Sequence, residues 1–217
     1  MEGKRFAASL FCFSMNMMRD ETMTTIATGH LLLRAPAEQD LASIASLLAD
    51  IDVSRMLARV PHPYTLEHAE GWFAKINVPG AGGERVFAIA LDGQPVGMVG
   101  FQDKGGEPIL GYWLGRPFWG RGLMSEAARA AVEWYFDEYD DAALFSGAFE
   151  DNPASLRIQQ KLGFEVTGSA LLDCLATGEP RPEVRTWLAR ETFARLQAEN
   201  SPASNGLPLT GARKRAT

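Results

Sequence analysis

The chain has few of the residues that bind metals or form disulfide bonds. Its 217 residues include two cysteines, Cys12 and Cys174, and three histidines, His30, His62 and His68. The cysteines form no C-x-x-C pair, and no H-E-x-x-H or comparable ligand spacing is present in the sequence. We therefore expect neither a disulfide framework nor a metal site, and the two thiols are consistent with a reducing cytoplasm.

Long apolar runs and an excess of positive charge are also absent. No stretch approaches the roughly 20 apolar residues that a membrane-spanning helix needs, so we expect no membrane segment. The formal net charge of -6 argues against general binding to nucleic acid, whose phosphates attract basic proteins. With 46% hydrophobic and 22% charged residues, the composition is typical of a soluble globular domain.

The two ends of the chain carry little signal for ordered structure. Residues 1–28 contain a short apolar run without a clear signal-cleavage pattern, and we expect a disordered leader in which Met1 and Met23 are alternative biological starts. Residues 191–217 are expected to hold the end of a helix and a polar, disordered tail. One domain is expected over 29–190.

Hydrophobic periodicity between these ends predicts one mixed α/β domain. We expect strands at 31–35, 85–91, 95–102, 108–115, 143–149, 170–175 and 183–188. We expect three helices whose apolar faces are formed by Leu41, Ile44, Leu48 and Ile51, by Ala69, Trp72, Phe73 and Ile76, and by Leu123, Ala127, Ala131 and Trp134. Asp92-Gly93 predicts a hairpin turn, and Thr65 a helix N-cap. A last helix is expected to begin at Asn152 and Pro153 and to end before Gly163.

The segment FWGRGLMSEA, residues 118–127, places two glycines just before a predicted helix. It is not a P-loop, because no Lys-Ser/Thr follows the second glycine. It fits a dinucleotide fingerprint poorly, because Asp140 and Asp141 precede the next predicted strand instead of ending it. A plain strand-to-helix turn explains one glycine easily. An anion site explains both, since N–H groups at the helix start and Arg121 all favour a phosphate.

This segment belongs to a longer pattern, GYWLGRPFWGRGLMSEA followed by NPASLRIQQKLGF. The pattern resembles the GNAT superfamily of acyl-CoA-dependent N-acyltransferases, and more closely the branch with the Rim-type ribosomal-protein N-terminal acetyltransferases. The resemblance covers about 31–188. It implies a central mixed, mostly antiparallel sheet flanked by helices, acetyl-CoA as co-substrate, and transfer to a primary amine of a protein N-terminus or a small molecule. A monomer or a homodimer is expected.

The resemblance also implies roles for individual residues. The superfamily's pyrophosphate loop falls on 119–124, where Gly122 matches the required glycine and Met124 replaces a small residue. The implied coenzyme-binding residues are Trp113, Leu114, Trp119, Gly120, Arg121, Gly122, Leu123, Met124, Ser125, Asn152 and Ser155. The main chain at Leu114 is expected to polarise the thioester carbonyl, and Ser155 to protonate the departing thiolate. Both Asn152 and Ser155 have a structural alternative, because each suits the first turn of a helix.

The general base remains unassigned in the sequence. Ile109 stands where many Rim-type relatives carry glutamate, and Glu107, Glu150 and Asp151 are the remaining candidates. An α-amine with a pKa near ~7.7–8.0 needs a weaker base than a lysine amine near ~10.4.

The acceptor is expected to enter over residues 60–64 and 177–183. We interpret His62, which lies in the first of these segments, as a surface residue. The alternative function is a non-catalytic module that binds acyl-CoA and acts as a sensor or interaction partner.

Overall fold

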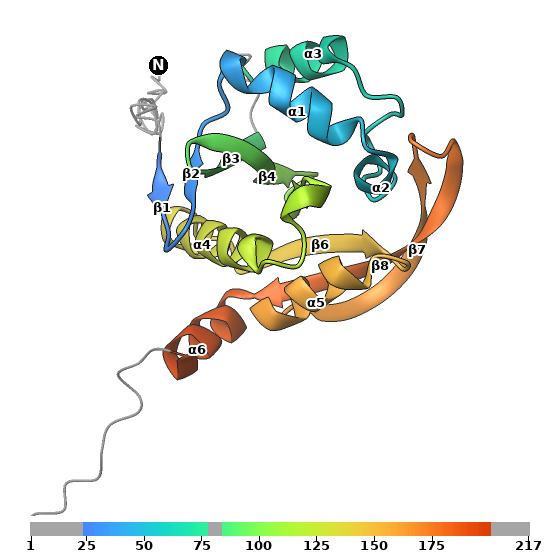
Figure 1. Ribbon diagram of the computed structural model, residues 1–217. Helices are drawn as coiled ribbons and strands as arrows, with labels where there is room; N and C mark the ends of the chain where they lie inside the picture. The colour runs from blue at the N-terminus through green and yellow to red at the C-terminus, as the bar shows by residue number, and fades with distance from the viewer. Residues whose placement is uncertain (1–23, 78–83, 201–217) are drawn as a thin grey trace, which may run out of the picture.

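The computed structural model describes residues 24–77 and 84–200 (Figure 1). They contain one eight-stranded sheet in the order β1-β2-β3-β4-β5-β6-β8-β7. The strands are β1 (Ile26–Ala27), β2 (Leu32–Arg34), β3 (Glu84–Leu91), β4 (Gln94–Asp103), β5 (Pro108–Leu114), β6 (Ala143–Phe149), β7 (Glu165–Cys174) and β8 (Glu179–Ala189). Adjacent strands are antiparallel except β5 and β6, which are parallel, and this confirms the predicted mixed sheet.

Helices cover both faces of the sheet (Figure 1). They are α1 (Leu41–Leu48), α2 (Ile51–Ser54), α3 (Leu66–Ile76), α4 (Leu123–Glu138), α5 (Pro153–Leu162) and α6 (Arg190–Asn200), with short 3-10 turns η1 (Glu38–Asp40) and η2 (Arg116–Phe118). Apolar side chains of α1 and α3 pack with Met98 of β4 on one face. Those of α4 and α5 pack with Val99 and Leu110 on the other face, because successive side chains of a strand point to opposite sides.

Local turn and cap chemistry places several boundaries where the sequence predicts them. Asp92 and Gly93 both have positive φ, 51° and 80°, in the hairpin between β3 and β4. The Thr65 side chain accepts a hydrogen bond from the His68 N–H at 3.4 Å and caps α3. Asn152 caps α5, and Gly163 ends it in the left-handed conformation.

The prediction of one helix running through Leu41 and Ile51 is wrong. Helix α1 ends at Leu48, and Asp50 adopts an extended conformation in which its side chain accepts from the Asp52 N–H at 3.0 Å. Asp50 therefore caps a second, short helix, because its carboxylate satisfies a backbone donor that a continuous helix would have used. Ile51 is 40% exposed and does not extend the apolar face of α1.

The last two strands are longer than predicted and form a hairpin that reaches the loop after α2 (Figure 1). The expected first strand at 170–175 in fact begins at Glu165, and the second begins at Glu179 instead of residue 183. The first residues of β7 are exposed at the sheet edge, so they lack the apolar signal on which the prediction relied. The Leu175 N–H donates to the Ala58 carbonyl at 3.0 Å, which joins the hairpin tip to that loop.

The described structure begins before the expected domain start at residue 29 and includes a helix end after residue 190, where one was expected. Ile26–Ala27 form β1 and pair with β2, so the end of the expected 1–28 leader belongs to the sheet. At the other end, α6 continues to Asn200. The rest of the expected leader and of the expected tail lies outside the described residues, as does Cys12.

Candidate active site

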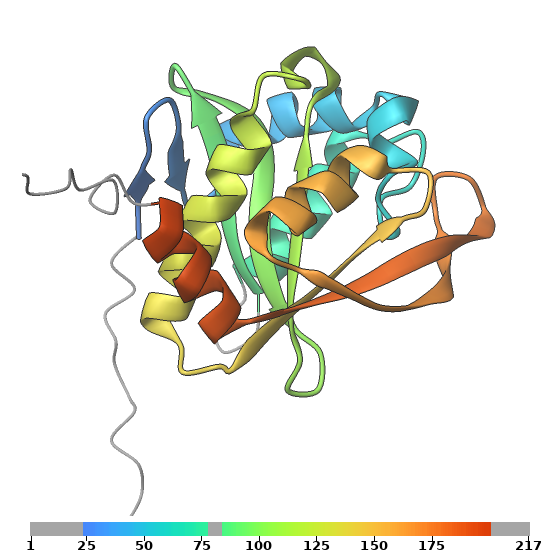
Figure 2. The same cartoon turned by 90° about the horizontal axis from the view of Figure 1, so that it is seen from below.

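The sheet opens between its two parallel strands. Strands β5 and β6 pair only at Ile109 and Phe145, and the Ser146 hydroxyl donates to the Leu110 carbonyl at 2.9 Å. Beyond this point the strands separate, and α5 lies across the opening (Figure 2). A cavity of about 1620 Å³ reaches the opening from both faces of the sheet.

The register of β4 and β5 determines which backbone groups face this opening. Gly97 lies opposite Leu114, and the adjacent Gly115 N–H donates to the Val96 carbonyl at 2.9 Å. The alternation of an antiparallel ladder then turns the N–H and C=O of Leu114 away from β4, toward the opening. The Trp119 indole confirms this direction, because its N–H donates to the Leu114 carbonyl at 2.7 Å. The Leu114 N–H is thus directed at the opening.

The same alternation distinguishes the two residues that precede Leu114, of which only Trp113 was predicted to bind the coenzyme. The N–H and C=O of Tyr112 also face the opening, whereas those of Trp113 face Met98 in β4. The Trp113 side chain packs on the α1 and α3 face. Trp113 lines the cavity, but on the side away from α4 and α5, and its polar backbone groups are directed into the ladder.

The two glycines of the opening segment form the turn from η2 into α4. Gly120 and Gly122 have φ of 73° and 79°, and a Cβ on either would meet no atom within 4 Å. Gly122 is the N-cap of α4, and no side chain caps this helix start. The first-turn N–H groups of α4 therefore have no intrahelical acceptor, and they line the cavity at Leu123, Met124 and Ser125. An open, donor-rich turn of this kind fits a pyrophosphate.

The side chains around this turn take two directions. Leu123 and Met124 are buried in the core below α4, so the methionine does not fill the space above the turn. Arg121 is exposed and does not line the cavity, while Arg157 and Lys161 line it from α5. Positive charge therefore borders the cavity from α5, while Arg121 lies in the turn itself.

Helix α5 places a hydroxyl pair beside the opening. The Asn152 side-chain oxygen accepts from the Ser155 N–H at 3.1 Å, so Asn152 is engaged as the helix cap. The Ser155 hydroxyl donates to the Tyr112 oxygen at 3.0 Å, and the Tyr112 hydroxyl donates to the Ser155 carbonyl at 3.2 Å. Burial raises the pKa of Tyr112, although hydrogen bonds with Ser155 and Gln159 oppose this shift, so the phenol keeps its proton.

A buried glutamine, which the sequence analysis missed, supports the serine. Gln159 is 1% exposed, and its Nε2 donates to the Gly147 carbonyl at 3.3 Å and to the Ser155 hydroxyl at 3.5 Å. Its Oε1 accepts from the Thr186 hydroxyl at 2.8 Å. The available signal was its position four residues after Ser155, which places both side chains on one face of α5.

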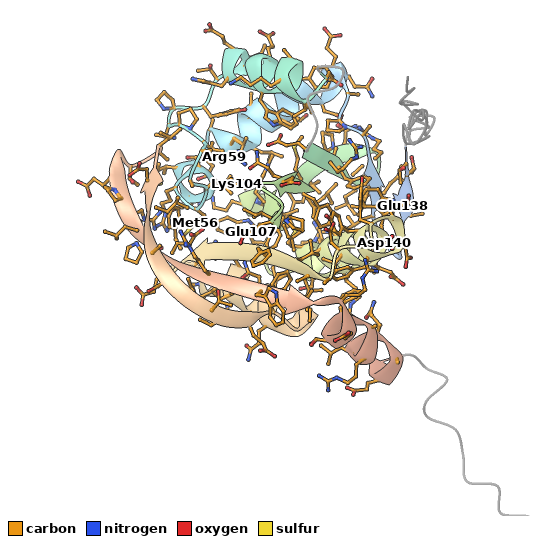
Figure 3. All side chains as sticks on the ribbon, turned by 180° about the vertical axis from the view of Figure 1, so that it is seen from behind. Met56, Arg59, Lys104, Glu107, Glu138 and Asp140 are labelled. Atoms are coloured by element: carbon orange, nitrogen blue, oxygen red, sulfur yellow. The ribbon has the colours of Figure 1, made fainter. Side chains whose placement is uncertain are left out.

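None of the carboxylates considered in the sequence analysis stands free at the opening. Glu107 is exposed beside Lys104 in the β4–β5 turn (Figure 3), seven residues before Leu114 and hence roughly 23 Å from it along the strand. Glu150 does not line the cavity, and Asp151 is held by Arg181, which donates to both of its oxygens at 2.5 Å.

The two predicted acceptor segments both border the cavity. Val60, Pro61 and Tyr64 line it from the first segment, and Glu183 lines it from the second. His62 is exposed and does not line the cavity. Within residues 24–77 and 84–200, no cluster of three or more histidine, cysteine or acidic side chains is arranged to hold a metal ion. Over the same residues, no helix is long and apolar enough to cross a membrane.

Comparison with known proteins agrees with this geometry. Residues 30–165 match the family model described as acetyltransferase (GNAT) domain. The uncharacterized N-acetyltransferase p20 of Bacillus licheniformis is 23% identical over 152 residues, which are 67% of this chain and 85% of p20.

The solved structures that are similar in fold include two acetyltransferases with stated acceptors. One is the Salmonella typhimurium acetyltransferase that modifies the N-terminal serine of ribosomal protein L7/L12, with 19% identity and a TM-score of 0.66 over 76% of this chain and 99% of that one. The other is the Vibrio cholerae spermidine N-acetyltransferase in complex with CoA and spermine, with 16% identity and a TM-score of 0.66 over 77% of this chain and 99% of that one. The family model matches more than half of this chain. The chain therefore belongs to the GNAT family of N-acetyltransferases, whose acetyl donor is acetyl-CoA.

Proposed function

We propose that this protein transfers the acetyl group of acetyl-CoA directly to a primary amine, on a protein N-terminus or a small molecule. The observation that carries the proposal is the opening between β5 and β6, where the Leu114 N–H and the Ser155–Tyr112 pair border one cavity. The turn at Gly120 and Gly122 holds the pyrophosphate of the coenzyme. The pantetheine arm extends from the pyrophosphate along the opening toward Leu114.

The reacting groups then follow from this placement. The amine attacks the thioester carbon, and the carbonyl oxygen gains negative charge beside the Leu114 N–H, which is already oriented and needs no rearrangement. As the C–S bond breaks, Ser155 donates its hydroxyl proton to the sulfur. Tyr112 suits the role of partner to Ser155, because its buried phenol carries a proton at neutral pH.

One assay tests the proposal and its alternative together. The protein is incubated with acetyl-CoA and a panel of amines that includes an unblocked peptide, a linear diamine and free amino acids, and the release of CoA thiol is measured. Thermal unfolding with and without acetyl-CoA reports binding independently. Thiol release above the amine-free rate supports acetyl transfer. Stabilisation by acetyl-CoA without thiol release from any amine favours the non-catalytic acyl-CoA-binding module, and an absence of both contradicts the proposed site.

A further inference from the structure

We propose that Glu183 receives the acceptor amine and takes its proton, at a window in the sheet formed by Gly111 and Gly147. This inference rests on the proposed acetyl transfer, and it names a base that the start of strand β5 does not supply. Ile109 occupies that part of the strand, and the other cavity carboxylate near β6, Asp151, is bound to Arg181.

The window follows from the register of the parallel strands. Since Ile109 pairs with Phe145, two residues further on Gly111 comes opposite Gly147, where the strands are already separating. Both positions lie on the α1 and α3 face, the face to which Trp113 belongs. A Cβ on Gly111 would meet no atom within 4 Å, so this side of the window is open space.

The Glu183 carboxylate forms the other side of the window. Glu183 lies on β8 opposite Phe149, and a Cβ built on Gly147 would come within 2.5 Å of its Oε1. Its side chain is 18% exposed and borders the cavity. The carboxylate therefore covers Gly147 directly, in space that any larger residue at that position would fill.

The proposed acid, Ser155, and the proposed base, Glu183, then lie on opposite faces of the sheet at Gly147 of β6. The Gly147 carbonyl accepts from Gln159, which also contacts the Ser155 hydroxyl from the α5 face. The Glu183 carboxylate covers the same residue from the acceptor face. An amine that enters over Gly111 meets the carboxylate first and the thioester second, while the leaving sulfur remains on the side of Ser155.

The charges around Glu183 leave one of its oxygens available. Arg185 on the same strand lies 3.5 Å from Oε2, while Arg181 is engaged with Asp151. Ala170, which pairs with Glu183 from β7, carries no charge. No hydrogen bond within the described residues reaches Oε1, the oxygen that lies over the window.

The proton balance of the step is complete with these groups. The ammonium gives one proton to Glu183, its nitrogen lone pair forms the C–N bond, and the carbonyl electrons move to oxygen beside the Leu114 N–H. The C–S bond then breaks, and the sulfur takes the Ser155 hydroxyl proton. The second proton leaving nitrogen restores Ser155 through solvent, and Glu183 returns its proton to water. The net products are the amide, the CoA thiol and one proton.

The test compares Glu183→Gln with Glu67→Gln, which removes the same charge from an exposed position of the same cavity. Single-turnover transfer to the fastest amine of the panel is expected to fall about 10²–10⁴-fold in Glu183→Gln and to change little in Glu67→Gln. Acetyl-CoA should stabilise both variants as it does the wild type. The rate of Glu183→Gln should rise with pH up to the pKa of the free amine, since only the neutral amine then reacts, whereas the wild-type rate levels off earlier.

Two glycine variants test the window itself. Gly147→Ala should displace the carboxylate and lower the rate without changing any charge. Gly111→Ala fits the fold, because its new methyl group enters open space, and it should raise the KM for bulky amines more than for slender ones. A Glu183→Gln protein with the wild-type rate and pH profile would overturn the role of Glu183 alone. A wild-type protein inactive with every amine would instead overturn the proposed function.

Discussion

The turn before α4 offers a sharp test, because the chain contains a matched control for it. Gly122 and Gly105 both have positive φ, 79° and 69°, and a Cβ on either would meet nothing within 4 Å. Replacement by valine therefore strains both backbones in the same way, at a cost of about 1–2 kcal/mol each. Only Gly122 borders the cavity, since Gly105 lies in the turn between β4 and β5.

The expected difference is large enough to measure by thermal unfolding. Acetyl-CoA at 100 times its Kd should add about 2.7 kcal/mol of apparent stability to the wild type and to Gly105→Val. If the valine side chain at Gly122 weakens binding 100-fold, the same concentration adds only about 0.4 kcal/mol. For a chain of this size, these values correspond to Tm increases of about 5–11 °C and about 1–2 °C.

The assay is a set of melting curves for the three proteins, each with and without acetyl-CoA. The two variants should unfold at similar temperatures without ligand, which controls for the strain. Equal stabilisation of Gly122→Val and Gly105→Val would refute the reasoning, because the glycine would then serve only the chain turn.

Three further predictions concern side chains around the site and below it. Ser155→Ala should lower single-turnover transfer about 10²–10⁴-fold with acetyl-CoA stabilisation unchanged, and a wild-type rate would exclude Ser155 as the proton donor. Gln159→Leu should lower kcat more than it changes either KM, because the Ser155 hydroxyl loses a positioning donor; an effect on stability alone, seen by denaturant unfolding, would contradict this role. Asp40→Asn should cost about 1.5–3 kcal/mol at pH 7, since it removes the charge that accepts two hydrogen bonds from Arg34, which measure 2.6 and 2.8 Å. Burial alone raises the pKa of Asp40, but the hydrogen bonds from Arg34 and the Ala37 N–H outweigh it and lower the pKa. The stability that the pair contributes is therefore present above about pH 4 and is lost as the pH falls, so the wild type and Asp40→Asn should become equally stable in acid. A difference in unfolding free energy that does not change with pH would be inconsistent with a charge effect.

Features that depend on neighbouring residues were accessible from the sequence. The caps at Thr65 and Asn152 and the turn at Asp92 and Gly93 each need only a few residues to form, and the structure has all of them. The glycine turn before α4 was accessible for the same reason. By contrast, the apolar spacing that suggested a helix through Ile51 carried no information about the Asp50 cap, which ends α1.

Features that depend on strand register were not accessible. Tyr112 and Ser155 are 43 residues apart, and they meet only because α5 crosses the opening beside β5. Gln159 contacts Gly147 on β6 and Thr186 on β8, and both pairings require the strand order of the finished sheet. Glu183 reaches the cavity because β8 lies next to β6, whereas the sequence analysis considered acids near in sequence to the motifs.

The proposed reaction site lies where the pairing of β5 with β6 ends. A backbone N–H in the interior of a sheet is normally paired, because a buried unpaired donor costs free energy. Here the Ser146 hydroxyl donates a hydrogen bond to the Leu110 carbonyl, which would otherwise accept from the next N–H of β6. The parallel ladder ends at this point. The N–H of Leu114 thereby faces the opening; β4 holds the Trp113–Leu114 peptide that carries it, and the Trp119 indole holds the following peptide through the Leu114 carbonyl. The donor is thus fixed by the fold, and in the acetyl transfer proposed above it would meet the developing oxyanion without rearrangement.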